Sequence, residues 1–193
     1  GVPVVIGRPE VIDVRLRRAG LRLEVGKSLE VVDPGNDRRF TDYWRTYHRI
    51  MGRRGVSTEI ARLTVRSNPT VIGALMLEKG DADALICGTS GSHESHRIHL
   101  EQVIGLAPGV RTASALSILM LSSGLVFMTD THCTAKPDVD DVVEAAILAA
   151  CYIRSFGVDP KAALLSYSNF GTREGDSPVK MRRPPLAMTL PRG

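Results

Sequence analysis

The stretch CGTSGSHESHRIHLEQ, residues 87–102, brings three of the chain's five histidines within seven residues of one another. His93, His96 and His99 are donors of the type that zinc prefers, and zinc sites on helices use ligands at i and i+3 or i+4. Each step of three residues turns the next imidazole by about 60° around a helix, too far for three rings to meet at one ion. We therefore predict histidines that line a cleft or pack at a helix start, and no metal site.

The glycine- and serine-rich turn ahead of these histidines has the composition of an anion site. Backbone N–H groups of Thr89, Ser90, Gly91 and Ser92 can point at a ligand where a helix begins and its dipole favours negative charge. The fixed glycine spacing of a P-loop or a dinucleotide motif is missing. Two interpretations stay open, an anion-binding turn and an ordinary strand-to-helix connection.

A second polar turn follows the apolar residues of the stretch 162–168. Ser166, Ser168 and Asn169 lie there without the GxSxG pattern of a serine hydrolase. Arg66 is a candidate partner for a bound phosphate, because a guanidinium group can bind two phosphate oxygens at once. An arginine on a helix is, however, usually part of a solvated face. We predict ligand binding for these residues and assign none of them a catalytic role.

Alternating apolar runs and amphipathic segments must position both turns. Buried strands are expected at residues 3–7, 29–33, 82–88 and 162–168, and a hairpin at 113–121 and 124–130. Helices are expected at residues 8–20, 40–55, 57–67, 68–80, from about Ser92 onward, and at 138–157. This order predicts an α/β fold with three α/β/α layers, whose mostly parallel sheet includes an antiparallel strand. Ligands of such folds bind at the carboxyl ends of the strands.

The composition narrows the class of function. Aromatic residues make up 5% of the chain, and the arginines behind the net charge of +4 are spread along it, so nucleic-acid binding is disfavoured. No apolar run approaches the ~20 residues that span a bilayer, and three cysteines without a CxxC pair fit a reducing cytoplasm. The balance suits a soluble protein with an anionic small-molecule ligand. The proline-containing residues 184–193 are expected to be a disordered tail.

Several segments together resemble the phosphotransacetylase-like domain at the C-terminus of NADP-dependent malic enzymes. They are the run YWRTYHRIMGRRG and the motifs GDADALICG, PGVRTA and LLSYSNFG, none of which would suffice alone. The resemblance implies a fold of the isocitrate/isopropylmalate dehydrogenase type, with two subdomains and an acyl-CoA and phosphate site between them. We expect residues 1–183 to form an incomplete domain of this kind that lacks most of the second subdomain.

The resemblance also implies a function. One arginine of active phosphotransacetylases falls on Met51 in this sequence, and a second falls on Ile98, one residue from Arg97. Cationic groups stabilise the charge that develops in group transfer, so their replacement favours a regulatory domain that senses acetyl-CoA. An active phosphate acetyltransferase, which converts acetyl-CoA and phosphate to acetyl phosphate and CoA, is the second hypothesis. A purely structural oligomerisation module is the third.

The first hypothesis assigns partners and cofactors as well. The domain itself would hold no cofactor, and acetyl-CoA would be its effector. NADP and a divalent metal would belong to the malic catalytic domain in cis, which decarboxylates malate oxidatively to pyruvate. We expect a cytoplasmic homo-oligomer, at least a dimer, that binds a small acyl-CoA molecule and neither nucleic acid nor membrane.

Overall fold

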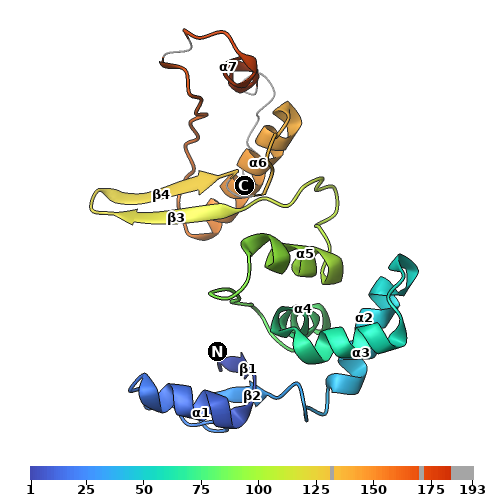
Figure 1. Cartoon of the computed structure of the whole chain (residues 1–193). Coiled ribbons are helices and arrows are strands. Elements are labelled where there is room, and N and C mark those ends of the chain that lie inside the picture. Colours follow the sequence, from blue (N-terminus) through green and yellow to red (C-terminus); the bar gives the residue numbers. More distant parts are fainter. Residues whose placement is uncertain (131–132, 170–171, 184–193) are drawn as a thin grey trace. The chain divides into compact units, whose positions relative to one another are not determined.

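The computed structural model describes residues 1–130, 133–169 and 172–183. The chain forms two compact units, Gly1–Gly105 and Leu106–Gly193 (Figure 1). The tail predicted at 184–193 lies outside the described residues. None of the helices in the described ranges combines the length and the apolarity that crossing a membrane requires.

A parallel strand pair and its connecting helix open the first unit. Strands β1 (Val4–Ile6) and β2 (Glu30–Val32) pair with Val5 opposite Val31, and helix α1 (Pro9–Arg18) lies between them in sequence. β-Branched valines favour this extended conformation, because their side chains pack well on a pleated surface. The prediction of strands at 3–7 and 29–33 with a helix between them is confirmed.

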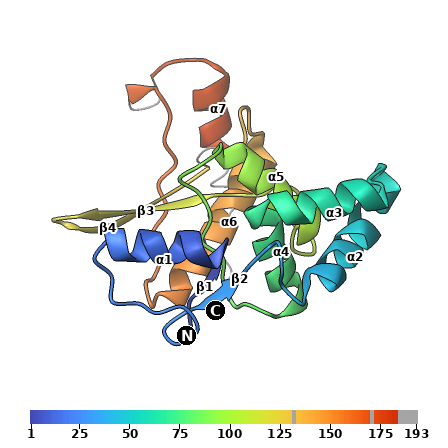
Figure 2. The same ribbon diagram turned by 60° about the horizontal axis from the view of Figure 1, so that its bottom comes forward.

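Helices make up the rest of this unit. They are α2 (Phe40–Met51), the 3-10 helix η1 (Gly52–Arg54), α3 (Thr58–Ser67), α4 (Pro69–Lys79) and α5 (His93–Val103). Residues 70–76 of α4 are all buried, as expected for a helix enclosed by its neighbours. α2, α3 and α5 each contact α4, and Figure 2 shows α2 and α3 beside it. The helices that we predicted in residues 40–103 are confirmed, and α4 is the centre of this core.

A buried hydroxyl fixes α2 to the end of α4. Tyr43 is 1% exposed, and its hydroxyl donates a hydrogen bond of 2.8 Å to the carboxylate of Asp81. Burial, with the bond to Asp81, raises the pKa of Tyr43 well above its ordinary value. A buried hydroxyl without a partner would destabilise the fold. The packing of α2, which buries Tyr43, therefore requires that Asp81 lie within hydrogen-bond distance of it.

Residues 82–88 join α4 to α5 without forming a strand, so our prediction of a buried strand here was wrong. Leu85 packs against α4 where the helix carries Gly73, and a Cβ there would lie 2.5 Å from Leu85 Cδ1. Ile86 is 99% exposed. An apolar run becomes a strand only where a neighbouring strand accepts its backbone hydrogen bonds, and in the described chain no strand pairs with these residues.

A hairpin and a long helix dominate the second unit. Strands β3 (Leu116–Leu121) and β4 (Gly124–Thr129) pair antiparallel, which confirms the predicted hairpin. Helix α6 (Val139–Ser155) begins with a capping box. The Asp138 carboxylate accepts the N–H of Asp141, and the Asp141 carboxylate accepts the N–H of Asp138. Two otherwise unpaired N–H groups are thereby satisfied, which explains why the helix starts here.

Helix α7 (Asp176–Arg182) follows a long irregular segment. Lys180 ties it to the start of α6 by donating a hydrogen bond of 2.6 Å to the carbonyl of Pro137. Residues 162–168, which we predicted as a buried strand, are irregular, and Leu165 is 76% exposed. As with residues 82–88, the apolar run has no strand beside it among the described residues.

The described residues thus form two separate two-stranded sheets, one parallel and one antiparallel. The α/β class and the antiparallel pair are confirmed. The single, mostly parallel sheet that we predicted is not present in these residues, because two of its expected strands are irregular segments.

One ion pair at the start of α2 gives a pH-dependent prediction. The Arg39 guanidinium, bonded to Asp37 at 3.0 Å, holds the pKa of that carboxyl below its ordinary value. Its stabilising effect is therefore present at neutral pH and is lost as the pH falls through the lowered pKa. We expect Asp37→Asn to lower the free energy of unfolding by about 1 kcal/mol at pH 7.

Urea denaturation of both proteins between pH 7 and acid tests this prediction. The difference between wild type and Asp37→Asn should shrink towards zero in acid, because protonation removes the same charge. Asp83→Asn, at an exposed position, is the control and should change stability at pH 7 by less than about 0.5 kcal/mol. A difference for Asp37→Asn that does not vary with pH would contradict the assigned cause.

Candidate functional site

The turn at residues 88–92 leads directly into α5. Ser92 is the N-cap of this helix, and its Oγ accepts the N–H of Ser95 at 3.1 Å. Thr89 has φ +62° and Gly91 has φ +89°, so both occupy the left-handed region. Glycine adopts that conformation without strain, whereas a threonine rarely does. The helix start near Ser92 is confirmed.

The backbone of this turn presents unused donors. In the part of the chain that the structure describes, no protein acceptor receives the N–H groups of residues 89–92. These residues are exposed and precede a helix N-terminus. Such N–H groups, together with the helix dipole, attract anions.

His96 holds the turn in place. Its Nδ1 lies 2.8 Å from the hydroxyl of Thr70, and its Nε2 lies 2.8 Å from the carbonyl oxygen of Ser90. Thr70 is buried in the first turn of α4. One imidazole therefore connects the exposed turn to the centre of the core, which is the packing role predicted for the histidines.

His99 makes a parallel connection one turn further along α5. Its Nε2 lies 2.9 Å from the side-chain nitrogen of Asn68, whose oxygen caps α4 by accepting the N–H groups of Thr70 and Val71. The Nδ1 atom of His99 is buried and has no hydrogen-bond partner among the described residues.

These contacts bear on the metal interpretation. Both ring nitrogens of His96 are engaged by protein atoms, so neither offers a free lone pair to an ion. Among the described residues no group of three or more His, Cys, Asp or Glu side chains could hold a metal.

The second predicted turn lies in the other unit. Its hydroxyl groups organise the loop itself. The Oγ of Ser166 accepts the N–H of Ser168 at 3.3 Å, and the Oγ of Ser168 accepts the N–H of Arg173 at 2.9 Å. The carbonyl of Asn169 accepts the N–H of Thr172 at 3.2 Å. Ligand binding by these residues stays a prediction.

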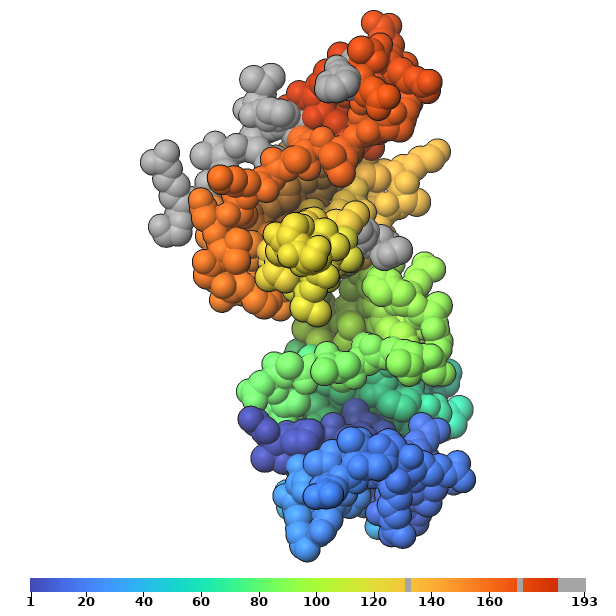
Figure 3. Space-filling view, turned by 90° about the vertical axis from the view of Figure 1, so that its left-hand side faces the viewer, coloured from blue at the N-terminus to red at the C-terminus, as the bar shows by residue number. Residues whose placement is uncertain are grey.

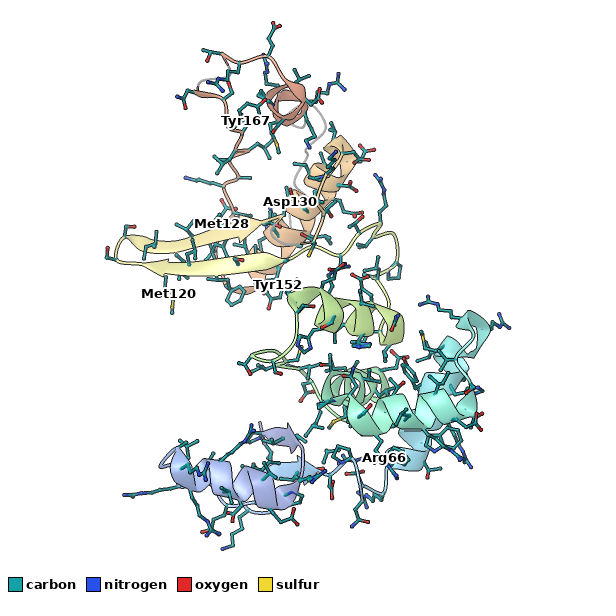
Figure 4. All side chains as sticks on the ribbon, viewed as in Figure 1. Arg66, Met120, Met128, Asp130, Tyr152 and Tyr167 are labelled. Atoms are coloured by element: carbon teal, nitrogen blue, oxygen red, sulfur yellow. The ribbon has the colours of Figure 1, made fainter. Side chains whose placement is uncertain are left out.

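Arg66 lies on α3, where Figure 4 labels it. Its guanidinium carbon is 4.8 Å from the centre of the Phe40 ring, so the side chain is stacked on α2. Within the described residues no hydrogen bond or ion pair joins it to the turn at 88–92. Its role as a phosphate partner stays a prediction.

The two positions that the resemblance assigns to arginine carry apolar side chains of different exposure. Met51 is 5% exposed and belongs to the core, whereas Ile98 is 39% exposed on α5. The neighbouring Arg97 forms an ion pair with Glu101 one turn away. The Nε atom of Arg97 is buried and has no hydrogen-bond partner in the described chain.

Sequence reasoning missed a polar cluster in the second unit. Both oxygens of the Glu144 carboxylate accept the backbone N–H of Arg111 at 3.1 Å, and one accepts that of Thr112 at 3.2 Å. The Arg111 guanidinium lies 3.2 Å from Asp138 and 3.6 Å from Asp141. The acidic start of α6 thereby fixes the PGVRTA motif. The only sequence signal was an arginine upstream of an acidic helix start, which specifies no pairing.

A pocket that the sequence did not indicate lies between the base of the hairpin and α6. Its volume is about 390 Å³. Its lining consists of Ser114, Ala115, Leu116, Thr129, Leu148, Ala149 and Tyr152. The hydroxyl oxygens of Ser114 and Thr129 are 3.1 Å apart. Next to it, Asp130 has φ +59°, and burial raises the pKa of its carboxyl. The lining is mainly apolar, carries the hydroxyl groups of Ser114, Thr129 and Tyr152, and has no charged residue.

The fold and these motifs are those of one known family. The family model described as phosphate acetyl/butaryl transferase matches residues 1–185. The chain belongs to the phosphate acetyl/butaryl transferase family.

Relatives define the branch. The chain is 45% identical to the NADP-dependent malic enzyme of Escherichia coli over 94% of its length, and 47% identical to the NAD-dependent malic enzyme of Rhizobium meliloti over 93%. It spans only 24% and 23% of those proteins. The phosphate acetyltransferase of Nitratidesulfovibrio vulgaris is 30% identical over 89% of the chain. The resemblance to the phosphotransacetylase-like domain of malic enzymes is confirmed.

Solved structures confirm the fold. The EutD phosphotransacetylase from Staphylococcus aureus superimposes with a TM-score of 0.76 and 21% identity, over 96% of this chain and 56% of that protein. A phosphotransacetylase from Streptococcus pyogenes gives a TM-score of 0.74 and 20% identity, over 90% and 52%. The mixed α/β arrangement of this chain is thus that of about half a phosphotransacetylase.

The connection through His96 can be tested by removing one hydroxyl. Thr70→Val keeps the shape of the side chain and removes the group bonded to His96 Nδ1. We expect the free energy of unfolding to fall by about 1–2 kcal/mol, because the part-buried hydrogen bond between Thr70 and His96 is lost. NMR chemical-shift changes should extend from α4 to residues 88–92. The exposed Thr41→Val is the control, and shift changes confined to α4 would contradict a role in holding the turn.

Proposed function

We propose that the chain is a regulatory domain of an NADP-dependent malic enzyme and that it senses acetyl-CoA. The malic catalytic domain would lie in cis, bind NADP and a divalent metal, and convert malate to pyruvate by oxidative decarboxylation in the cytoplasm. The observation that carries this proposal is the contrast in identity. Malic enzymes match at 42–47% over 93–94% of the chain, and phosphate acetyltransferases match at 24–30%.

The charge distribution favours sensing over turnover. Transfer of an acetyl group to phosphate builds negative charge that cationic side chains must stabilise. Met51 and Ile98 are uncharged, although the resemblance assigns arginines of active phosphotransacetylases to these two positions. The neighbouring Arg97 is paired with Glu101. A cleft of this kind can retain affinity for a ligand without stabilising its transition state.

The turn at residues 88–92 is the element that we propose for the anionic part of acetyl-CoA. Its unused N–H groups and the start of α5 offer donors to phosphate oxygens. His96 links the turn to α4 through Thr70, so a ligand that shifts the turn would act directly on the core. Such a chain of hydrogen bonds is one path by which an effector can influence a distant site.

We further propose the complete architecture of the isocitrate/isopropylmalate dehydrogenase type, with three layers and two subdomains. Residues 1–183 would supply part of it. Ser166, Ser168, Asn169 and Arg66 would face the ligand in that larger assembly, together with the turn at 88–92.

Oligomerisation is a second function that one observation favours. The hairpin register places Ile118, Met120 and Leu125 on one face and Val126 and Met128 on the other. All five are between 41% and 86% exposed. Figure 4 shows Met120 and Met128 extending from the strands, and in Figure 3 the hairpin (yellow) lies open on the face shown.

A strand pair that is apolar on both faces is typical of one that is covered on both faces. We therefore propose a homo-oligomer in which the hairpin is buried against another subunit.

The acetyl-CoA proposal predicts that a single methyl group added to the turn at 88–92 weakens ligand binding. Gly91→Ala places a Cβ on a residue with φ +89° and 3.3 Å from His96 Nε2, which distorts the turn. We expect affinity for acetyl-CoA, measured by calorimetry, to fall by about tenfold or more, equal to at least 1.4 kcal/mol. Gly105→Ala is the matched control, because its φ is +80° at the far end of α5 and its added Cβ meets no atom within 4 Å.

The complete polypeptide that contains these residues provides the functional measurement. Acetyl-CoA should inhibit malate oxidation in the wild type and in Gly105→Ala, and less in Gly91→Ala. Inhibition that is equal in all three would remove the turn from the proposal. Release of acetyl phosphate from acetyl-CoA and phosphate would instead establish the active transferase, and the absence of any acetyl-CoA effect would leave the structural module.

The hairpin proposal predicts a change of assembly. Val126→Glu introduces a charge on one apolar face, which we expect to weaken self-association, because an unpaired buried charge is strongly unfavourable. Sedimentation velocity over a range of concentrations should show the wild type as the larger species. Ser123→Glu, between the two strands, adds the same charge and should behave like the wild type. A wild type that stays monomeric throughout would contradict the proposal.

A further inference from the structure

Two arginines of α3 stack on two aromatic rings of α2. The guanidinium carbon of Arg62 is 4.3 Å from the centre of the Trp44 ring, and that of Arg66 is 4.8 Å from the centre of the Phe40 ring. The two arginines are four residues apart on α3, and the two rings are four residues apart on α2. The two stacked contacts therefore lie one helical turn apart along the same seam between the helices. Arg45 lies 5.6 Å from the same Trp44 ring. Stacking on a ring restrains a guanidinium group and leaves its N–H edge free to bond.

The surroundings of this seam are strongly cationic. Residues 38–67 contain eight arginines and two acidic residues. The acidic residues are both engaged, since Asp42 pairs with Lys79 at 2.7 Å and Glu59 bonds to Ser57 at its own helix start. In the described chain no carboxylate lies within 4.0 Å of Arg45, Arg62 or Arg66, although Glu59 acts on Arg62 at longer range.

Apolar side chains complete the same surface. Leu63 is 67% exposed and Ile60 is 51% exposed, and the helical period places both beside Arg62 and Arg66 on one continuous arc of α3. Large apolar side chains next to stacked arginines and a tryptophan have the composition of a protein interface. We define the cationic face as Trp44, Arg45, Ile60, Arg62, Leu63 and Arg66.

We propose that the cationic face docks an acidic protein segment, a helix or strand whose carboxylates meet Arg62 and Arg66 and whose apolar side chains cover Leu63 and Ile60. We choose an acidic partner because of charge complementarity: each restrained guanidinium group can bond both oxygens of a carboxylate. Binding of single-stranded nucleic acid would need open aromatic faces, and here guanidinium groups already stack on both rings. A second copy using the same face would bring like charges together. This inference does not depend on acetyl-CoA binding.

The probe is a fluorescein-labelled helical peptide with glutamates at i and i+4 and leucines beside them, titrated with the full chain and followed by anisotropy. Arg62→Glu combined with Arg66→Glu should weaken binding by more than about tenfold. Arg18→Glu combined with Arg22→Glu makes the same charge change at exposed positions of the first unit, and should weaken it by less than about twofold. Leu63→Ala should weaken binding, whereas Leu21→Ala, at a site 52% exposed, should not.

Each alternative gives a different outcome, and far-ultraviolet circular dichroism confirms that every variant is folded. Equal losses in the two arginine pairs would show attraction by net charge alone and would overturn the proposal. So would a single-stranded DNA oligonucleotide of equal charge that binds as tightly as the peptide and is unaffected by Leu63→Ala. Self-association that is abolished by Arg62→Glu with Arg66→Glu would assign the face to a second copy and would also overturn it.

Discussion

The burial of α4 is the constraint on which the first unit depends. A helix enclosed on all sides cannot expose the N–H groups of its first turn to water, so its neighbours must satisfy them. Asn68 does so and is itself bonded to His99, while Thr70 is bonded to His96. The histidines that first suggested chemistry thus complete a buried helix start. The geometry of the exposed turn at 88–92 is a consequence of this packing, because His96 also bonds the carbonyl of Ser90.

The second unit differs from the first in that its main strand pair is exposed and not buried. Glu144 and the acidic start of α6 surround Arg111, but the hairpin has exposed apolar side chains on both faces. Exposed apolar area of this extent is unfavourable in water. The apolar surface in this unit and the arginine-rich surface of α2 and α3 in the other are therefore suited to different kinds of partner, one apolar and one acidic.

Much of the local structure could be predicted from the sequence, because it depends on short-range patterns. Ser92 as a helix start, the caps around α4 and the hairpin at 116–129 follow from residues within a few positions of one another. The segments 82–88 and 162–168 could not be predicted, since a strand depends on a partner edge that sequence periodicity does not report. The contacts of Arg111 with α6, and the pocket beside the hairpin, join residues far apart in sequence, and no short-range pattern specifies them.

The sequence by itself determined the family, the helices and the identity of the residues in the turn at 88–92, because these reside in motifs and in the period of apolar side chains. Only the tertiary structure decided what those residues do for one another. It assigned His96 and His99 to the start of α4, placed Met51 in the core, and gathered scattered arginines into one face by packing α3 against α2. The reason is physical: hydrogen bonds and ring stacking act over a few ångströms of space, however many residues separate the partners along the chain.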